Sequence, residues 1–367
     1  MKVQFSDLSF FNNFFKEEIE IKLKSMISKS KFIGGEEKYN FEKKFAKYCE
    51  TKNCIGVGNC TDALEIALEA FGFPQDSEII VPSNTFIATS EAVTRSGLKV
   101  VFADCNPRNY TISLESILKK ITNKTRAIIA VHLYGHPADM DGISEIIKSN
   151  KIKIIEDCAQ AHGALYKGSK VGGIGDVGVF SFYPGKNLGA FGDAGCIVTN
   201  NNSLAIKCRM IANHGRLEKY NHQFEGRNSR LDSIQAAVLS IKLKYLDRIN
   251  QLRIKNSKYY FNALSGIKNI ILPIKEEWCI SVFHQFVIRV KDRNKLVNYL
   301  KKNGIETGIH YPIALPNLKA YESFKGQCSN FFATQNDSNI LSLPISEHLK
   351  INELKYVVNK IKEYYNE

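Results

Sequence analysis

Residues 54–200 alternate between short apolar segments and stretches with helical periodicity. The apolar segments are rich in Val and Ile, and turn-forming residues bound each of them. They cover residues 54–58, 78–82, 99–104, 126–135, 152–157, 177–183 and 195–200. Near-continuous apolar strands that alternate with amphipathic helices are what a mostly parallel sheet covered on both faces requires. The pattern therefore predicts an α/β fold built on a seven-stranded, mostly parallel sheet flanked by helices.

The pattern changes after a long helical segment over residues 230–264. The elements predicted beyond it are two short strands and a final amphipathic helix, at 283–290, 304–312 and 351–367. With 367 residues, the chain is also longer than a single hydrophobic core usually supports. We therefore expect a large α/β domain over 1–240 and a small α+β domain over 241–367.

Charge and cysteine content narrow the class of protein. The net charge is +13, but the lysines are dispersed over helical segments without a nucleic-acid-binding motif, so we expect a solvated basic surface and no nucleic-acid partner. The nine cysteines are irregularly spaced and form no CxxC pair, which favours free thiols in a reducing compartment over disulfides or a metal site. Residues 1–26 contain no predicted signal peptide or membrane span. We expect a cytoplasmic protein without metal or membrane partner.

Lys186 stands in an unusual setting for a charged residue, because the segment 181–186, Ser-Phe-Tyr-Pro-Gly-Lys, surrounds it with glycine, proline and apolar residues. An amine in a partly dry setting has a lowered pKa and becomes a nucleophile or a base. A solvated loop lysine is the alternative interpretation.

Residues 173–178 match the G-x-G-x-x-G dinucleotide pattern, but a strand rather than a helix follows them, so we do not expect a dinucleotide site there. Gly185 and Lys186 lack the other residues of a P-loop.

A carboxylate lies where a parallel sheet would bind a ligand. Asp157 ends an apolar strand, so it is expected at the carboxyl edge of the sheet, where a buried charge needs a cationic partner. A salt bridge or a helix cap would satisfy that need. The pyridinium nitrogen of pyridoxal 5′-phosphate (PLP), a cofactor that forms a Schiff base with a lysine, would satisfy it equally. Phe86 is a candidate for stacking on the pyridine ring, and a place in the core is its alternative.

Such a cofactor also needs a phosphate site. Residues 58–62 lie between a predicted strand and a predicted helix, where helix N–H groups bind anions. Thr61 or Asp62 acting only as a helix N-cap is the alternative. Ser181 and Asn228 are further candidate hydrogen-bond donors to the phosphate.

In this chain order, these features resemble the DegT/DnrJ/EryC1/StrS family of PLP-dependent nucleotide-sugar aminotransferases, and the resemblance covers nearly the whole chain. The segments that carry it are EDCAQAHGA, GDVGVFSFYPGKNLGAFGDAG and GRNSRLDSIQAAVL, at 156–164, 175–195 and 226–239. The resemblance implies the fold of the type I aminotransferases. It also implies that Lys186 forms the imine with PLP, that Asp157 pairs with the pyridine nitrogen, and that Gln160 lies against the cofactor near its phenolic oxygen.

The remaining cofactor contacts are likewise implied by the resemblance. Phe86 matches the position that stacks on the ring. The residues that match the phosphate cup are Asn59, Cys60, Thr61 and Ser181, with Asn228 reaching in from the second subunit of a homodimer with shared active sites. Many relatives have glycine where this chain has Cys60, whose side chain restricts the backbone dihedrals. This departure concerns the exact geometry of the cup rather than its existence.

The reaction implied by the resemblance is a transamination from L-glutamate to a nucleotide-linked ketosugar. Residues 183–186 and 308–312 are similar to those of family members that act at C3 of dTDP-3-keto-6-deoxyhexoses. Tyr183, His310 and Tyr311 are therefore expected to line the sugar-nucleotide site. The alternatives are that Tyr183 only packs beside the lysine and that His310 is a hydrogen-bonded loop histidine.

Residues 314–321, ALPNLKAY, depart from the pattern of the C3 enzymes. Amination at C4 of a UDP- or dTDP-linked 4-keto-6-deoxy sugar is therefore an alternative reaction. A PLP-binding regulatory protein without catalytic activity is the alternative from a different class of function.

Overall fold

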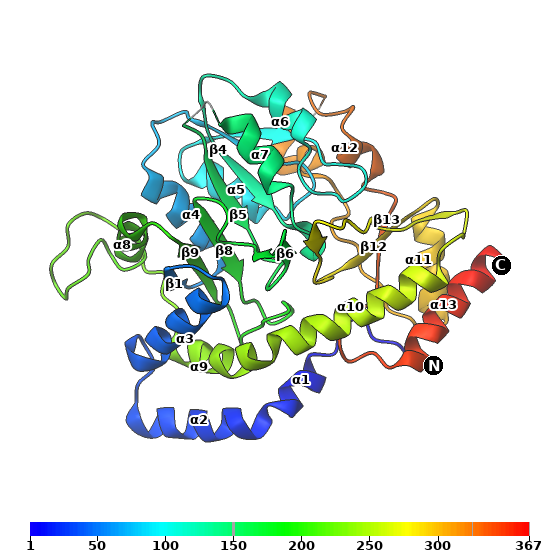
Figure 1. Cartoon of the computed structure of the whole chain (residues 1–367), viewed down its shortest axis with the longest axis horizontal. Helices are drawn as coiled ribbons and strands as arrows, with labels where there is room; N and C mark the ends of the chain where they lie inside the picture. The colour runs from blue at the N-terminus through cyan, green and yellow to red at the C-terminus, as the bar shows by residue number, and fades with distance from the viewer. Residues whose placement is uncertain (149–150, 325, 367) are drawn as a thin grey trace.

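The structure is a computed structural model, and it describes residues 1–148, 151–324 and 326–366. A seven-stranded sheet forms its centre, with helices on both sides (Figure 1). The order of the strands is β1-β9-β8-β5-β4-β2-β3. Their bounds are Asn53–Val57 (β1), Glu78–Pro82 (β2), Lys99–Ala103 (β3), Thr125–Val131 (β4), Lys153–Asp157 (β5), Val177–Ser181 (β8) and Gly195–Thr199 (β9). Each predicted apolar segment forms one of these strands, which confirms the predicted α/β fold.

The strand directions bring several chain segments to one edge of the sheet. Strands β3, β2, β4, β5 and β8 are parallel to one another, whereas β9 is antiparallel to both β8 and β1. The carboxyl ends of β1, β2, β4, β5 and β8 therefore lie at the same edge. Ligands bind at this edge in open α/β sheets.

Helices cover both faces of the sheet and explain why its strands are apolar along their whole length. The main helices of this part are α3 (Gly35–Tyr48), α4 (Cys60–Phe71), α5 (Ala88–Arg95), α6 (Leu114–Lys120), α7 (Met140–Ile147), α8 (Asn202–Ile211) and α9 (Ser233–Lys242). Successive strand residues point to opposite faces. On β5, Ile155 packs into the core beneath α4, whereas Ile154 packs into the core that contains Phe41 and Phe45 of α3.

The carboxyl-terminal part forms a smaller antiparallel sheet with its own core. Its strands are β10 (Ile270–Ile271), β12 (Phe286–Val290) and β13 (Ile340–Leu343), and the helices around them are α10 (Leu246–Ala263), α11 (Arg293–Lys302) and α13 (Ile351–Tyr365). The predicted strand at 283–290 and the final helix are confirmed. The strand predicted at 304–312 is wrong, because Gly308 and Ile305 make only isolated bridges, to Ser342 and Val3.

Each of the two parts contains residues from the other end of the chain in its core. Ala314, Leu315 and Tyr321 belong to the core of the large sheet, although they lie far beyond residue 240. At the other end of the chain, Val3 lies fully buried in the core of the small sheet. The domain boundary near residue 240 therefore stays a prediction. Helices α1 (Leu8–Phe14) and α2 (Lys16–Lys29) connect the small part to the α/β part beneath α9 and α10 (Figure 1).

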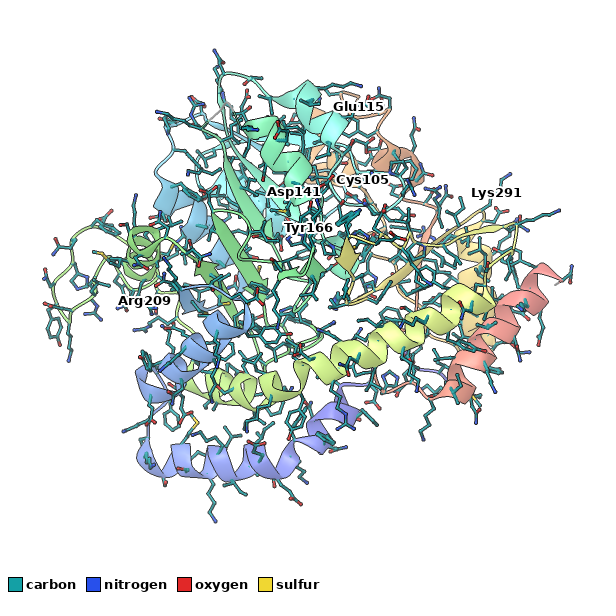
Figure 2. The ribbon with its side chains drawn as sticks, in the orientation of Figure 1. Cys105, Glu115, Asp141, Tyr166, Arg209 and Lys291 are labelled. Atoms are coloured by element: carbon teal, nitrogen blue, oxygen red, sulfur yellow. The ribbon has the colours of Figure 1, made fainter. Side chains whose placement is uncertain are left out.

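A third small sheet and several polar contacts secure the loops around the large sheet. The strands of this sheet are β6 (Leu165–Tyr166), β7 (Ser169–Lys170) and β11 (Cys279–Ile280). Tyr166 accepts a hydrogen bond from the backbone N–H of Asp141 at 3.0 Å, and both side chains are labelled in Figure 2. On the opposite side, Arg209 of α8 pairs with the buried Glu42 at 3.0 Å (Figure 2). Among the helices described, none is long and apolar enough to cross a membrane.

Candidate active site

A cavity of about 310 Å³ opens at the carboxyl edge of the sheet. The predicted site residues that line it are Asn59, Cys60, Thr61, Phe86, Asp157, Gln160, Ser181, Tyr183, Lys186 and Tyr311. These residues come from the ends of β1, β2, β5 and β8 and from one carboxyl-terminal loop. The structure thus brings together residues that are up to 252 positions apart in the sequence.

The amino terminus of α4 forms one end of the cavity. Asn59 is the N-cap, and its side chain accepts a hydrogen bond from the N–H of Asp62 at 2.8 Å. Among the described residues, the backbone N–H groups of Cys60 and Thr61 have no acceptor, so both are free to bind an anion. Gly195 allows this turn to approach the sheet, because a Cβ atom there would lie 2.8 Å from the nitrogen of Cys60.

Cys60 does not require glycine's conformational freedom. It begins α4 and is absent from the residues with positive φ, so its backbone has the ordinary right-handed helical conformation. Replacing glycine by cysteine therefore costs little backbone strain here. Burial raises the pKa of the Cys60 thiol well above its usual range, with the charge of Asp157 as a smaller cause. The thiol is therefore protonated and does not compete with the lysine as a nucleophile.

Asp157 forms the middle of the cavity wall. Its carboxylate is only 5% exposed, and it accepts hydrogen bonds from the hydroxyl of Thr89 at 3.0 Å and the N–H of Ala159 at 3.1 Å. Burial raises its pKa above the usual range, while these two hydrogen bonds and the more distant charge of Lys186 act in the opposite direction. The carboxylate forms no ion pair among the described residues, so a cationic N–H on a ligand would complete its surroundings.

Lys186 closes the cavity from a tight turn after β8. Its backbone N–H donates to the carbonyl of Tyr183 at 2.9 Å. Burial lowers the pKa of the Lys186 amine, although the nearby Cys60 and Asp157 oppose this effect. Within the described part of the chain, the amine makes neither a hydrogen bond nor an ion pair. The unusual sequence around Lys186 thus leaves an amine that is free to react.

These features fit PLP. The two free N–H groups of α4 suit a phosphate, the buried carboxylate of Asp157 suits a pyridinium N–H, and the free amine of Lys186 suits an aldehyde. Phe86, whose side chain is 54% exposed, presents its ring at this cavity, 5.6 Å from the ring of Tyr311. The alternative that places Phe86 in the core is therefore wrong.

Gln160 links the cavity to a residue that the sequence analysis missed. Its Oε1 accepts a hydrogen bond from the N–H of Tyr134 at 2.6 Å, and its Nε2 donates to the hydroxyl of Tyr311 at 2.9 Å. The hydroxyl of Tyr134 donates in turn to the backbone carbonyl of His310. Tyr134 therefore holds Gln160 and the 310–311 loop in one arrangement. Its signal in the sequence is weak, because a tyrosine after a strand has many structural roles.

Two predicted residues do not line the cavity. The imidazole Nδ1 of His310 is hydrogen-bonded to the hydroxyl of Ser342 at 2.8 Å, and its ring stacks on Phe5 at 5.7 Å. Burial, with the charge of Lys186 as a smaller cause, lowers the pKa of His310 to about 4, so this ring is neutral at pH 7. Asn228 lines a neighbouring hollow, which shares Asn59, Thr61 and Asp193 with the cavity. Tyr183 does line the cavity, and its side chain is 58% exposed.

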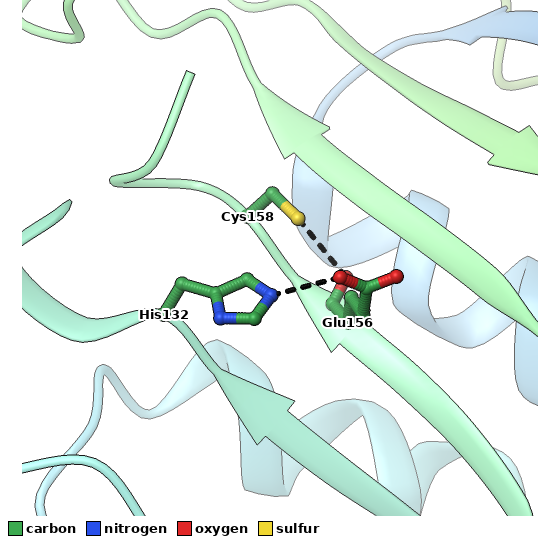
Figure 3. A group of neighbouring side chains, drawn as sticks. All are labelled: His132, Glu156 and Cys158. Carbon is green, nitrogen blue, oxygen red and sulfur yellow. Dashed lines mark hydrogen bonds and ion pairs between the residues drawn. The ribbon is translucent and has the colours of Figure 1, made fainter. Parts of the chain in front are cut away.

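Glu156 has a different role from its neighbour Asp157. It is fully buried and accepts backbone hydrogen bonds from Gly172, Ile174 and Gly175 at 2.7–2.8 Å. With His132 and Cys158 it forms the group of side chains in Figure 3. Because Nδ1 of His132 accepts a hydrogen bond from a backbone N–H, its Nε2 carries the hydrogen and donates to Glu156 at 3.0 Å. These contacts use the ligand atoms that a metal ion would need.

The fold and the site together define a PLP-dependent aminotransferase of fold type I, with a lysine and a buried carboxylate that line one cavity. The chain belongs to the DegT/DnrJ/EryC1/StrS aminotransferase family, whose family model matches residues 14–362. Its cofactor is PLP.

The alignments with named relatives cover nearly the whole chain. The dTDP-3-amino-3,6-dideoxy-alpha-D-galactopyranose transaminase of Aneurinibacillus thermoaerophilus is 44% identical, and the alignment covers 99% of both chains. A pleiotropic regulatory protein of Geobacillus stearothermophilus is 41% identical over 100% of this chain and 99% of the relative. The solved structure of S. venezuelae DesV in complex with a ketimine intermediate matches with a TM-score of 0.97 at 38% identity, covering 100% of this chain and 99% of DesV.

Proposed function

We propose that the protein transfers the amino group of L-glutamate to a dTDP-3-keto-6-deoxyhexose and so forms a dTDP-3-amino-3,6-dideoxyhexose. The observation that carries this proposal is the cavity in which the free amine of Lys186 and the buried carboxylate of Asp157 face the amino terminus of α4. The 44% identity to a transaminase that is named for a dTDP-3-amino-3,6-dideoxy sugar supports the choice of substrate.

We assign a separate role in the reaction to each of three residues that line the cavity. When bound, PLP supplies an electron sink for the carbanion that forms at the substrate carbon. Asp157, held by Thr89, keeps a proton on the ring nitrogen, since a buried carboxylate stabilises an adjacent cation. Lys186, whose amine has a lowered pKa, would take the proton from the substrate carbon and hold it for its return. Phe86 excludes water from one face of the ring.

We propose the cofactor contacts from the family resemblance and from the residues that line the cavity. The N–H groups of Cys60 and Thr61 and the hydroxyl of Ser181 bind the phosphate, and Asn59 holds their turn by capping α4. Gln160, which is fixed by Tyr134 and Tyr311, would lie near the cofactor's phenolic oxygen. For the sugar nucleotide we propose Tyr183, His310 and Tyr311. Of these, Tyr183 and Tyr311 present their rings at the cavity, and His310 contributes through its loop.

The site is proposed to be shared in a homodimer, with Asn228 of a second subunit binding the phosphate. Within one subunit, Asn228 does not line the cavity that contains Lys186, but lines the adjacent hollow. The test is to mix two inactive variants, Lys186→Ala and Asn228→Asp. A shared site restores activity on mixing, because one of the two sites in a mixed dimer then has both native residues. If mixing restores nothing although mixed dimers form, each subunit builds its own site.

The position of amination is tested by incubating the enzyme with glutamate and either a dTDP-3-keto or a 4-keto-6-deoxyhexose. We expect NMR of the product to place nitrogen on C3, and a product aminated only at C4 would overturn this assignment. Borohydride reduction followed by peptide mapping is expected to place the reduced cofactor on Lys186.

The relative named as a regulatory protein favours a second candidate function, in which the chain binds PLP without catalysis. This function predicts that the visible absorbance of the bound cofactor does not respond to glutamate. We expect instead that glutamate bleaches the absorbance and that 2-oxoglutarate restores it. We further propose that the protein acts in the cytoplasm, because its nine cysteines are all free thiols.

A further inference from the structure

A buried asparagine directly follows the reactive lysine. The side chain of Asn187 is 5% exposed and has hydrogen-bond partners at both ends. Its Oδ1 accepts from Nδ1 of His284 at 2.9 Å, and its Nδ2 donates to Oδ1 of Asn250 at 3.0 Å. Burial lowers the pKa of His284 well below its usual range, so this ring is neutral and its Nδ1 carries the donated hydrogen. The side chain next to Lys186 is therefore held from two different segments of the chain.

The hydrogen bonds continue from Asn250 to the end of strand β8. Asn250 lies on α10, and its Nδ2 donates to the carbonyl oxygen of His162 at 2.7 Å. The imidazole Nε2 of His162 donates to the carbonyl oxygen of Ser181 at 2.8 Å. Burial lowers the pKa of His162 to about 3, and its Nδ1 has no partner among the described residues, which leaves Nε2 as the nitrogen that carries the hydrogen. Each donor and acceptor in this series is thus determined.

We propose that Asn187 and Asn250 are positioning residues for the cofactor, because they tie the backbone at its covalent anchor, Lys186, to the backbone at its phosphate anchor, Ser181. We call this series the Asn187 chain. It consists of His284, Asn187, Asn250, His162 and Ser181. The proposal rests on the proposed function, which assigns those two anchoring roles.

The connection matters because Ser181 ends β8, whereas Lys186 lies in the loop that follows it. Residues 182–194 leave the sheet after β8 and return to it at β9, with the N–H of Ala190 donating to the carbonyl of Phe182 at 2.8 Å. Lys186 lies in the middle of this excursion, where sheet hydrogen bonds do not reach. The Asn187 chain supplies the missing support from α10 and from His284, so the amine and the phosphate site keep a fixed separation. Fixed separation is what a ligand bound at both ends requires.

The simpler interpretation is that these amides only satisfy buried polar groups. The chain offers a matched control in Asn256, which also lies on α10, is 6% exposed, and donates to the carbonyls of Ile345 and Ser346 at 3.1–3.3 Å. Among the described residues, neither of these bonds reaches a member of the series that contains Asn187. Variants of Asn250 and Asn256 therefore remove the same kind of buried hydrogen bond from the same helix, but only one of them interrupts the Asn187 chain.

The experiment compares Asn250→Ala with Asn256→Ala in the full-length protein. We measure the thermal unfolding midpoint without cofactor, the dissociation constant of PLP, and the pH at which the absorbance of the bound cofactor titrates. Both variants are expected to lower the unfolding midpoint. Only Asn250→Ala is expected to weaken PLP binding, on the order of tenfold for a buried hydrogen bond, and to shift the titration. If both variants change PLP binding equally, the proposal is wrong.

Asn250→Asp and Asn256→Asp replace the alanine pair if either alanine variant fails to fold. Each keeps the size of the side chain, exchanges its N–H donors for a carboxylate oxygen, and adds the same negative charge to both members of the pair. Failure of this inference is separate from failure of the proposed function. If peptide mapping finds the cofactor of the unmodified protein on a lysine other than Lys186, the proposed function fails. If it finds Lys186 and the two variants behave alike, only the inference fails.

Discussion

The hydroxyl of Thr89 donates a hydrogen bond to the buried carboxylate of Asp157 at 3.0 Å. This contact stabilises the ionised acid, whose pKa burial otherwise raises. In Thr89→Val the carboxylate loses this donor without a change in shape. We expect kcat/KM for glutamate to fall roughly ten- to a hundredfold, the effect of a hydrogen bond to a charged group. The matched control is Thr94→Val, on the same helix but exposed and without contact to the site. Equal activity of Thr89→Val and the native enzyme would contradict the assigned role of Thr89.

Lys186 is predicted to make the stability of the cofactor-free protein depend on pH. Its folded pKa lies below the ordinary value of 10.5, so between these two values the unfolded chain binds more protons than the folded one. Stability contributed by this residue is therefore present above pH 10.5 and lost as the pH falls through the folded pKa. We expect Lys186→Met to be more stable than the native apoprotein at neutral pH, with a difference that shrinks as the pH rises.

Denaturant unfolding of the apoproteins at several pH values measures this dependence. Lys258→Met is the control, because Lys258 is an exposed residue of α10. Should the advantage of Lys186→Met be the same at all pH values, its origin is packing rather than charge.

Tyr134→Phe is predicted to affect one half of the reaction. It removes the hydrogen bond to the carbonyl of His310 but keeps the backbone N–H that binds Gln160. We expect KM for the sugar nucleotide to rise on the order of fivefold, and the glutamate half-reaction to keep its rate. Steady-state and single-turnover kinetics separate the two halves. A slower glutamate half-reaction with unchanged KM for the sugar would place Tyr134 on the cofactor side instead.

Glu156→Gln is predicted to destabilise the fold without involving a metal ion. The amide group that replaces one carboxylate oxygen would face backbone N–H donors, so buried groups lose their partners. We expect a loss of about 3 kcal/mol in the free energy of unfolding, measured in urea. Dialysis of the native protein against a chelator is expected to leave its melting temperature unchanged. A melting temperature that falls after dialysis would show that the group in Figure 3 holds a metal.

The strands of the large sheet were predictable because both sheet faces are covered. Ile154 and Ile155 are adjacent, yet each packs into a different core, which is why the segment is apolar throughout. Residues 304–312 contain isoleucines in a similar pattern, but they form only two isolated β-bridges, to Val3 and to Ser342. An apolar pattern does not show whether a neighbouring strand is available along the whole segment.

The same distinction applies to the site. Residues at strand ends, such as Asp157 and Ser181, were predictable because the direction of the strands sends them to one edge. Thr89 and Tyr134 were missed because the contacts of their hydroxyl groups depend on side-chain direction, and threonine and tyrosine are common in structural as well as functional positions. The direction of His310 toward Ser342 likewise depends on packing against the small sheet.

Residues near the start of the chain pair with a segment that lies about three hundred residues later in the sequence. The N–H of Val3 binds the carbonyl of Gly304 at 2.9 Å, and the carbonyl of Val3 accepts from Glu306 at 3.0 Å. During synthesis on the ribosome, the segment around Val3 therefore stays unpaired until some three hundred later residues have been translated.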